Sequence, residues 1–450
     1  MSSSKNREPG ILIQGIHGRY ELAEKLGSGG NGDVYAVNLI DVDESFALSD
    51  EYVIKRLNLA HVSDENERSK RKQRFWREIS NVQQLQEQVH GILPIYDHSD
   101  SIAERDIDNW YLMPRAKPYY FGQRVDPEKI LLDAISIGRT LQQIHNSGRA
   151  HRDIKPTNIL FYKRRPVISD FGLVWRDNDV SITESGEHIG PGAIRPPELE
   201  YIHNMDLDTD DYFCSDVYMF AKTIWIFLTG NRYGFRGEYT RGNTGIYLKD
   251  NIIYPPLCLE PLNIMLERAT KNEPSQRCSL EACIVLLKEE IDIIQGSISP
   301  QLLGQYMFDE SIVESQSKIE SSEIIYNDAH GIISIISKLQ GLAYAVITEY
   351  EAEYNIGVVQ SIEYFGGHNY ILRLKQNPKP GKAYNVMTFY VGIEHFSISK
   401  NKKCSIKMAK PTIFGDEIPR SSNIMAIAQM NYTQVVLNSE LTINLYPISI

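Results

Sequence analysis

Apolar and polar positions alternate along the first part of the chain in a way that predicts a small β-rich lobe. Residues 1–18 are polar and rich in serine, and we expect them to be flexible. From Tyr20 the alternation indicates strands, which a glycine-rich turn interrupts at residues 27–32. A strand resumes at 34–37, and another is predicted at 52–55 after an acidic loop.

Helical spacing replaces this alternation further along the chain. Residues 64–88 contain no proline or glycine, and their apolar residues recur at helical spacing. The same pattern is found over residues 130–145, and further helices are predicted after Cys214 and Pro261. A mostly helical lobe is therefore expected to follow the β-rich lobe.

A change of pattern near Gly296 predicts a second domain. Residues 296–300 read Gly-Ser-Ile-Ser-Pro, which is typical of a linker, and residues 311–339 are polar and predicted to be helical. Strands are then predicted at 343–350, 356–364, 370–374 and 386–393. The expected organisation is a flexible N-terminus at 1–18, a first domain at 19–295 with lobes at about 19–113 and 117–295, a linker at 296–310, and a separate, mostly β domain at 311–450.

Composition narrows the class of protein. At 450 residues the chain is too long for one ordinary core, and 42% hydrophobic with 23% charged residues is typical of a folded protein. A net charge of −11 argues against a general nucleic-acid or anionic-membrane surface. The N-terminus lacks a signal-peptide pattern and no apolar run could span a bilayer, so we expect a cytoplasmic protein. The five cysteines are scattered without a CxxC pair, which predicts reduced thiols.

One short string carries the chemistry. Residues 151–158 read His-Arg-Asp-Ile-Lys-Pro-Thr-Asn, and Asp170-Phe171-Gly172 follows after a short apolar run. Asp153 fits a proton acceptor for a hydroxyl. The amide oxygen of Asn158 and the carboxylate of Asp170 can hold magnesium against the phosphates of a nucleotide.

The glycine-rich turn is weak evidence alone, because such turns also form ordinary hairpins. Here it precedes Val34 on a strand, so its amides could cover phosphates while Val34 packs on adenine. Lys55 ends the next strand, where it could bind the α and β phosphates, and Glu78 could pair with it from a helix. The predicted contacts of the turn are Gly27, Ser28, Gly29 and Gly32.

In this order and spacing the chain resembles the protein kinase family over about Tyr20 to Ile294. The resemblance implies an α+β, two-lobed protein kinase fold, with ATP and Mg²⁺ as cofactors. It also implies that Asp153 is the base, that Lys155 contacts the γ-phosphate, and that Asn158 and Asp170 bind magnesium.

Three further matches favour a protein kinase over a small-molecule kinase. Pro196-Pro197-Glu198 resembles the Ala-Pro-Glu that closes an activation segment, and Arg277 is the expected ion-pair partner of Glu198. Asp216 resembles the aspartate that supports the His-Arg-Asp loop.

The adenine site is expected at residues 111–116, which look like the hinge of a kinase. Met113 would be the gatekeeper, the carbonyl of Pro114 and the amide of Ala116 would face adenine, and Val53 and Leu160 would sandwich the ring with Val34.

Arg152 is placed to dock a phosphorylated activation segment, with Ser181, Thr183 and Ser185 as candidate sites. Serine and threonine are common in loops, so unmodified residues remain an alternative. Lys155 favours serine or threonine acceptors over tyrosine. Pro191 stands where the family has a small hydroxyl residue, which leaves acceptor preference open.

Two other functions stay open: a pseudokinase scaffold that binds nucleotide without transfer, and a kinase of small molecules. No motif identifies the second domain. Hypothetically, it senses a regulatory partner or recruits the protein substrate, while nucleic acid and membrane are not expected as partners.

Overall fold

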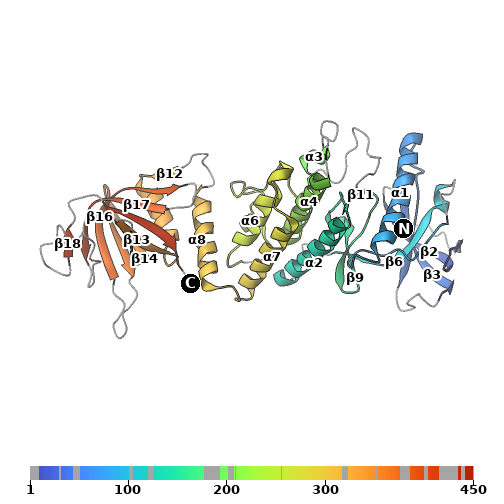
Figure 1. Ribbon diagram of the computed structural model, residues 1–450, viewed down its shortest axis with the longest axis horizontal. Helices are drawn as coiled ribbons and strands as arrows, with labels where there is room; N and C mark the ends of the chain where they lie inside the picture. The colour runs from blue at the N-terminus through green and yellow to red at the C-terminus, as the bar shows by residue number, and fades with distance from the viewer. Residues whose placement is uncertain are drawn as a thin grey trace, which may run out of the picture. The chain divides into compact units, whose positions relative to one another are not determined.

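The computed structural model forms two compact units. The first contains Met1–Thr240, Leu248–Pro255 and Leu262–Ile291, and the second contains Arg241–Tyr247, Pro256–Pro261 and Asp292–Ile450 (Figure 1). The structure describes residues 10–29, 32–43, 51–100, 105–119, 126–176, 193–200, 207, 209–254, 256–316, 323–349, 352–375, 386–399, 404–414, 434–436 and 441–448.

The first unit begins with a six-stranded antiparallel sheet in the order β1-β2-β3-β4-β6-β5. Its strands are β1 (Leu12–Gln14), β2 (Gly18–Gly29), β3 (Gly32–Val42), β4 (Tyr52–Arg56), β5 (Asp97–His98) and β6 (Trp110–Pro114). The predicted β-rich lobe is therefore confirmed. The expectation of a flexible segment at 1–18 is wrong for β1, which pairs with residues 19–21 of β2.

A buried carboxylate anchors this early part of the sheet. Asp97 accepts hydrogen bonds from the backbone amides of Ile16 and His17 at 3.2 and 3.0 Å. It also accepts one from the Tyr20 hydroxyl at 2.5 Å. Asp97 and Tyr20 are 2% and 0% exposed, so the bond between them is shielded from water, and the three bonds together connect the chain around the start of β2 to β5.

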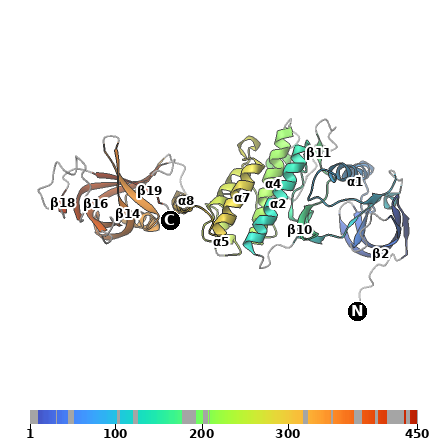
Figure 2. The same cartoon turned by 60° about the horizontal axis from the view of Figure 1, so that its bottom comes forward.

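Helix α1 (Glu65–Leu85) packs beside this sheet, as Figures 1 and 2 both show. The Asp64 side chain caps its first turn by accepting a hydrogen bond from the amide of Glu67 at 2.7 Å. The apolar residues that predicted the helix are all buried, namely Phe75, Ile79, Val82 and Leu85.

The mostly helical lobe follows. Its helices are α2 (Pro127–Asn146), α3 (Pro197–Glu200), α4 (Thr209–Thr229), α5 (Leu248–Asn251), α6 (Glu260–Ala269) and α7 (Leu280–Ile294). Both ribbon views show α2, α4 and α7 side by side. At Gly138 of α2, an added Cβ would lie 3.1 Å from Ile284 and 3.3 Å from Phe220, so this close approach favours glycine.

Short strands and helical turns connect the larger elements of this unit. They are η1 (Asp106–Asp108), β7 (Lys117–Pro118), β8 (Arg149–Ala150), η2 (Pro156–Asn158), β9 (Ile159–Tyr162), β10 (Arg165–Ile168), β11 (Trp175–Arg176) and η4 (Pro274–Gln276). Strands β9 and β10 form a hairpin. Its two turn residues, Lys163 and Arg164, have φ of 46° and 64°, the sign that a tight twisted hairpin requires.

The second unit is mostly β, as predicted. Its elements are α8 (Pro300–Gln316), β12 (Glu323–Tyr326), α9 (Ala329–Lys338), β13 (Ala343–Glu349), β14 (Ala352–Gly366), β15 (Asn369–Lys375), β16 (Val386–Ser399), β17 (Cys404–Phe414), β18 (Gln434–Val436) and β19 (Leu441–Pro447). The sheet order is β12-β16-β15-β14-β13-β19-β17-β18, and a further β16–β17 pairing closes the sheet on itself.

Two sequence expectations differ from this unit. Helix α8 occupies much of the segment expected to be a linker at 296–310. The segment 311–339, expected to be helical, contains strand β12 between α8 and α9. The sequence did not predict β17 or β19; β17 pairs with the preceding strand β16, whereas β19 pairs with the more distant strands β13 and β17.

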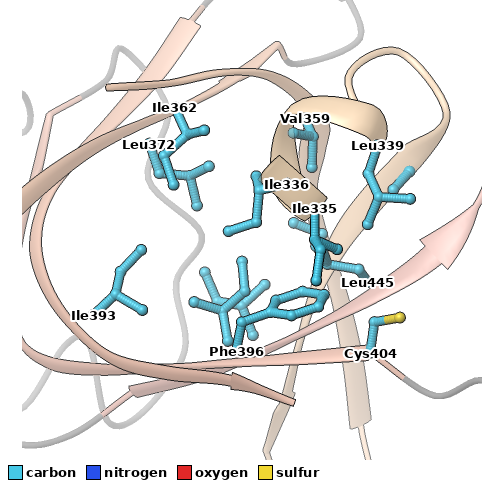
Figure 3. Packing of buried hydrophobic residues seen from close by; sticks show 14 of the residues in the cluster. Ile335, Ile336, Leu339, Val359, Ile362, Leu372, Ile393, Phe396, Cys404 and Leu445 are labelled. Atoms are coloured by element: carbon cyan, nitrogen blue, oxygen red, sulfur yellow. The ribbon is translucent and has the colours of Figure 1, made fainter. Parts of the chain in front are cut away.

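Helix α9 supplies much of the core of this unit. Its residues Ile335 and Ile336, with Leu339 just beyond it, gather with strand residues such as Phe396 and Leu445 (Figure 3). All five are at most 3% exposed. This apolar face buries the helix against the sheet and stabilises both. Of the helices that the structure describes, none combines the length and apolar character needed to cross a bilayer.

Candidate active site

An ion pair joins the small lobe's sheet to its helix. Lys55 on β4 donates to Oε2 of Glu78 on α1 at 2.8 Å, and the two side chains are 17% and 7% exposed. Burial alone would lower the pKa of the Lys55 ammonium. The Glu78 carboxylate, with Asp170 and the other neighbouring groups acting in the same sense, outweighs this effect and holds that pKa well above its ordinary value, so Lys55 stays charged.

Asp216 on α4 holds the His-Arg-Asp loop by its backbone. Its carboxylate oxygens accept hydrogen bonds from the amides of His151 and Arg152, each at 2.7 Å. Arg152 has φ of 66°, a left-handed conformation that non-glycine residues rarely adopt. The buried carboxylate thus supports a strained loop, which matches the role expected for Asp216.

Asp153 presents one unused oxygen. Its Oδ2 accepts from Lys155 Nζ at 2.6 Å and from Asn158 Nδ2 at 2.9 Å. Its Oδ1 is buried and has no hydrogen-bond partner among the described residues. Burial, with Asp170 acting in the same sense, raises the pKa of Asp153, although Lys155 opposes the rise. Oδ1 is therefore the oxygen of this carboxylate that no described group engages.

Asn158 and Asp170 carry the atoms expected to bind a metal. Both bonds of the Asn158 amide nitrogen go to Asp153, one to the backbone carbonyl and one to Oδ2, each at 2.9 Å. Its amide oxygen is therefore the atom that could face a cation. Burial alone would raise the pKa of Asp170, but Lys55 and Lys155 hold it below its ordinary value. An oxygen pair of this kind suits Mg²⁺.

A cavity of about 350 Å³ lies over these groups, a size within the range of small-molecule sites. The residues that line it are Gly27, Ser28, Val34, Lys55, Glu78, Val82, Leu93, Ile95, Tyr111, Met113, Thr157, Asn158, Leu160, Ser169, Asp170 and Phe171. Most of the predicted nucleotide contacts are in this set. Gly29, Gly32, Val53, Pro114 and Ala116 are not; Val53 and Pro114 lie on the paired strands β4 and β6 beside the cavity.

The glycine-rich hairpin is tied down by a residue that the sequence did not single out. Asp33 accepts from the hydroxyl of Ser28 at 2.7 Å and from Asn58 Nδ2 at 2.7 Å, and pairs with Lys25 at 2.8 Å. The Ser28 hydroxyl is thus directed at Asp33. Burial alone would raise the pKa of Asp33, but these donors hold it below its ordinary value.

Tyr111 begins the segment predicted to be the hinge, but the sequence assigned it no role of its own. It lies on β6 in the cavity lining, is 2% exposed, and has its ring centroid 5.4 Å from Lys55 Nζ. Burial and the Glu78 carboxylate raise the pKa of its phenol well above the ordinary value, so the hydroxyl stays protonated. The sequence did not predict its position in the cavity lining, because a single tyrosine on a predicted strand belongs to no motif.

Glu198 and Arg277 form the expected buried pair. Two parallel bonds of 2.6 and 2.8 Å join the guanidinium to the carboxylate, and the Ser215 hydroxyl donates a third at 2.6 Å. The side chains are 1% and 0% exposed. This bidentate pair fixes the end of the segment around α3 to the start of α4 and to η4.

The residues proposed for phosphorylation, Ser181, Thr183 and Ser185, and also Pro191, lie outside the part of the chain that the structure describes. So does Gly30 of the glycine-rich turn, while Gly29 ends β2. Arg152, their expected docking partner, places its guanidinium carbon 5.0 Å from the centre of the Tyr212 ring.

Comparison with known proteins agrees with this geometry. The family model described as "Protein kinase domain" matches residues 20–230. A probable serine/threonine-protein kinase of Streptomyces coelicolor is 26% identical over 206 residues, which cover 44% of this chain and 29% of that protein. Serine/threonine-protein kinase D of Synechocystis is 28% identical over 218 residues, covering 47% and 41%. The chain thus spans less than half the length of either relative.

Among solved structures, the PknI kinase domain of Mycobacterium tuberculosis is 22% identical, with a TM-score of 0.42 over 62% of this chain and 98% of that one. The family match encloses the ion pair, the loop held by Asp216 and the two candidate magnesium ligands. Residues 20–230 of this chain therefore match the protein kinase domain, the family to which these relatives are similar.

Proposed function

We propose that this protein is a serine/threonine protein kinase that transfers the γ-phosphate of ATP to protein hydroxyls with the help of Mg²⁺. The observation that carries the proposal is the buried, unpartnered Oδ1 of Asp153, whose other oxygen is held by Lys155 and Asn158. A positioned carboxylate with one free oxygen is what proton transfer from an acceptor hydroxyl requires.

Each neighbouring group supplies one part of the transfer. Asp153 would hold the acceptor hydroxyl and take its proton as the bond to phosphorus forms. Lys155 and Lys55 would carry positive charge to the phosphates, since both lie near Asp170 and Lys55 stays ionised. Magnesium bound by Asn158 and Asp170 would neutralise phosphate charge.

The named relatives are serine/threonine kinases, and Lys155 is consistent with that acceptor class. Retention of Lys55, Asp153 and Asp170 weighs against a pseudokinase scaffold, and the Glu198–Arg277 pair weighs against a small-molecule kinase. We further propose that phosphorylation near residues 181–185 regulates the activity when the phosphate docks on Arg152. We also propose that the C-terminal domain regulates the activity or recruits the substrate.

The test is transfer of labelled phosphate from ATP to a generic protein substrate, followed by identification of the labelled amino acid. We expect phosphoserine or phosphothreonine. In Asp153→Asn, transfer should fall by roughly two to four orders of magnitude while ATP binding persists. Undiminished transfer by that variant, or label only on small molecules, would contradict the proposal.

A further inference from the structure

Two of the cysteines lie side by side. Cys278 precedes helix α7 and Cys283 lies in its second turn, with their sulfur atoms 3.5 Å apart. Cys283 is 0% exposed, whereas Cys278 is partly exposed. Both are free thiols, as are the other three cysteines. The tertiary structure therefore reveals a dithiol where the sequence showed only scattered thiols.

The start of α7 explains the closeness. Ser279 caps the helix: its hydroxyl accepts from the Ala282 amide at 3.2 Å and its carbonyl accepts from the Cys283 amide at 3.1 Å. Residues before the cap and in the second turn commonly pack together as a hydrophobic staple. Any two apolar side chains would serve that purpose, so the packing alone does not call for two thiols.

The two sulfurs differ in their chemistry. The Cys283 thiol, acting as hydrogen-bond donor, lowers the pKa of Cys278, and Arg268 acts in the same sense. The same hydrogen bond and burial raise the pKa of Cys283 well above its ordinary value. A partly exposed sulfur with a lowered pKa thus lies against a buried sulfur with a raised pKa, which is the arrangement of a reactive and a resolving cysteine.

We propose that Cys278 and Cys283 are an oxidative modification site at which hydrogen peroxide produces an intramolecular disulfide. The Cys278 thiolate attacks one peroxide oxygen, the O–O bond breaks, and hydroxide leaves, so that Cys278 becomes a sulfenic acid. The Cys283 sulfur then attacks the Cys278 sulfur. The S–O bond breaks and the oxygen leaves as water with the Cys283 proton.

Disulfide formation would disturb the neighbouring ion pair between Arg277 and Glu198. The sulfurs must approach from 3.5 Å to about 2.05 Å, which pulls on the backbone of Cys278. The preceding residue is Arg277, whose guanidinium holds Glu198 and the carbonyls of Lys271 and Cys214. Oxidation would therefore weaken the ion pair between Arg277 and Glu198 and decrease phosphate transfer. This consequence rests on the proposed function, whereas the disulfide itself does not.

The site is tested on the full chain treated with hydrogen peroxide, alkylated, digested without reduction and mapped by mass spectrometry. We expect a linked peptide pair containing Cys278 and Cys283, lost on treatment with dithiothreitol. Cys278→Ser should abolish it, and Cys404→Ser, which removes another buried thiol, should leave it intact. Two unlinked thiols after peroxide, or a link to a different cysteine, would overturn the assignment.

The coupling is tested separately by phosphate transfer before and after peroxide. We expect a reversible decrease of about fivefold or more, in the range of ordinary coupling between sites, and no decrease in Cys278→Ser. A disulfide without any change in transfer would overturn the coupling to Glu198 alone. Absence of transfer in the untreated protein would refute the proposed function, while the peptide map would still decide the disulfide.

Discussion

The ammonium of Lys222 donates a hydrogen bond to the backbone carbonyl of Ala193 at 3.2 Å. Lys222 is 0% exposed within α4, and its second bond goes to the carbonyl of Phe235 at 2.7 Å. The rings of Tyr218 and Phe235 lie 4.4 Å from the same nitrogen. Ala193 is two residues from Pro191, so a buried amine holds the segment where acceptor binding is expected.

Replacing Lys222 should weaken binding of the acceptor substrate more than binding of ATP. In Lys222→Met, two buried carbonyls lose their donor, which we expect to cost about 1–3 kcal/mol of unfolding free energy. The segment around Ala193 would also lose its tether, so KM for a peptide acceptor should rise while KM for ATP stays unchanged. Steady-state kinetics with each substrate varied in turn provide the measurement. Equal changes in both KM values would argue for general misfolding.

Stability should depend on pH through the same residue. Burial lowers the pKa of Lys222 to about 7, far below that of an unfolded lysine. Above pH 7 the unfolded chain then binds more protons than the folded one, so Lys222 adds up to about 1.4 kcal/mol of stability per pH unit as pH rises. Denaturant titrations from pH 6.5 to about 9 should show this rise, with the range set by the two pKa values. The Lys222→Met variant should show a smaller rise; parallel curves would exclude the effect.

Two glycines of the glycine-rich hairpin should differ in their tolerance of an added side chain. A Cβ at Gly32 would lie 2.3 Å from the backbone oxygen of Arg56, whereas one at Gly27 would meet nothing within 4 Å. We therefore expect Gly32→Ala to lower the unfolding free energy by about 1–3 kcal/mol and Gly27→Ala to leave it nearly unchanged. Thermal denaturation of both variants checks this; equal losses would refute the steric explanation.

The anchor at Asp97 should contribute to the stability of the small lobe. Asp97→Ala would leave two partly buried amides and the buried Tyr20 hydroxyl without their acceptor, at a cost of about 2–4 kcal/mol. Tyr20→Phe removes a single bond and should cost about 1 kcal/mol. Denaturant unfolding of the single and double variants would measure their coupling. If the two losses simply add, the Tyr20–Asp97 bond contributes nothing.

The pattern of residues within single segments was sufficient to predict much of the architecture. Apolar spacing predicted α1 because its buried face depends on residues that lie within a few turns of one another. The segment from His151 to Asn158 could be interpreted for the same reason, since the proposed base, Asp153, and one proposed metal ligand, Asn158, lie close together along the chain. Lys55 and Glu78 could be paired in advance only because family resemblance supplied their relationship.

By itself the sequence determined the two-domain plan, the β-rich and helical lobes, and the identity of the residues expected to perform the transfer. Only the tertiary structure decided which distant groups meet, namely Asp33 with Asn58 and Lys222 with Ala193. It also closed the sheet of the second unit through β17 and β19. These contacts depend on which side chains are buried and on how separate segments of the chain pack together. The residue spacing within a single segment specifies neither.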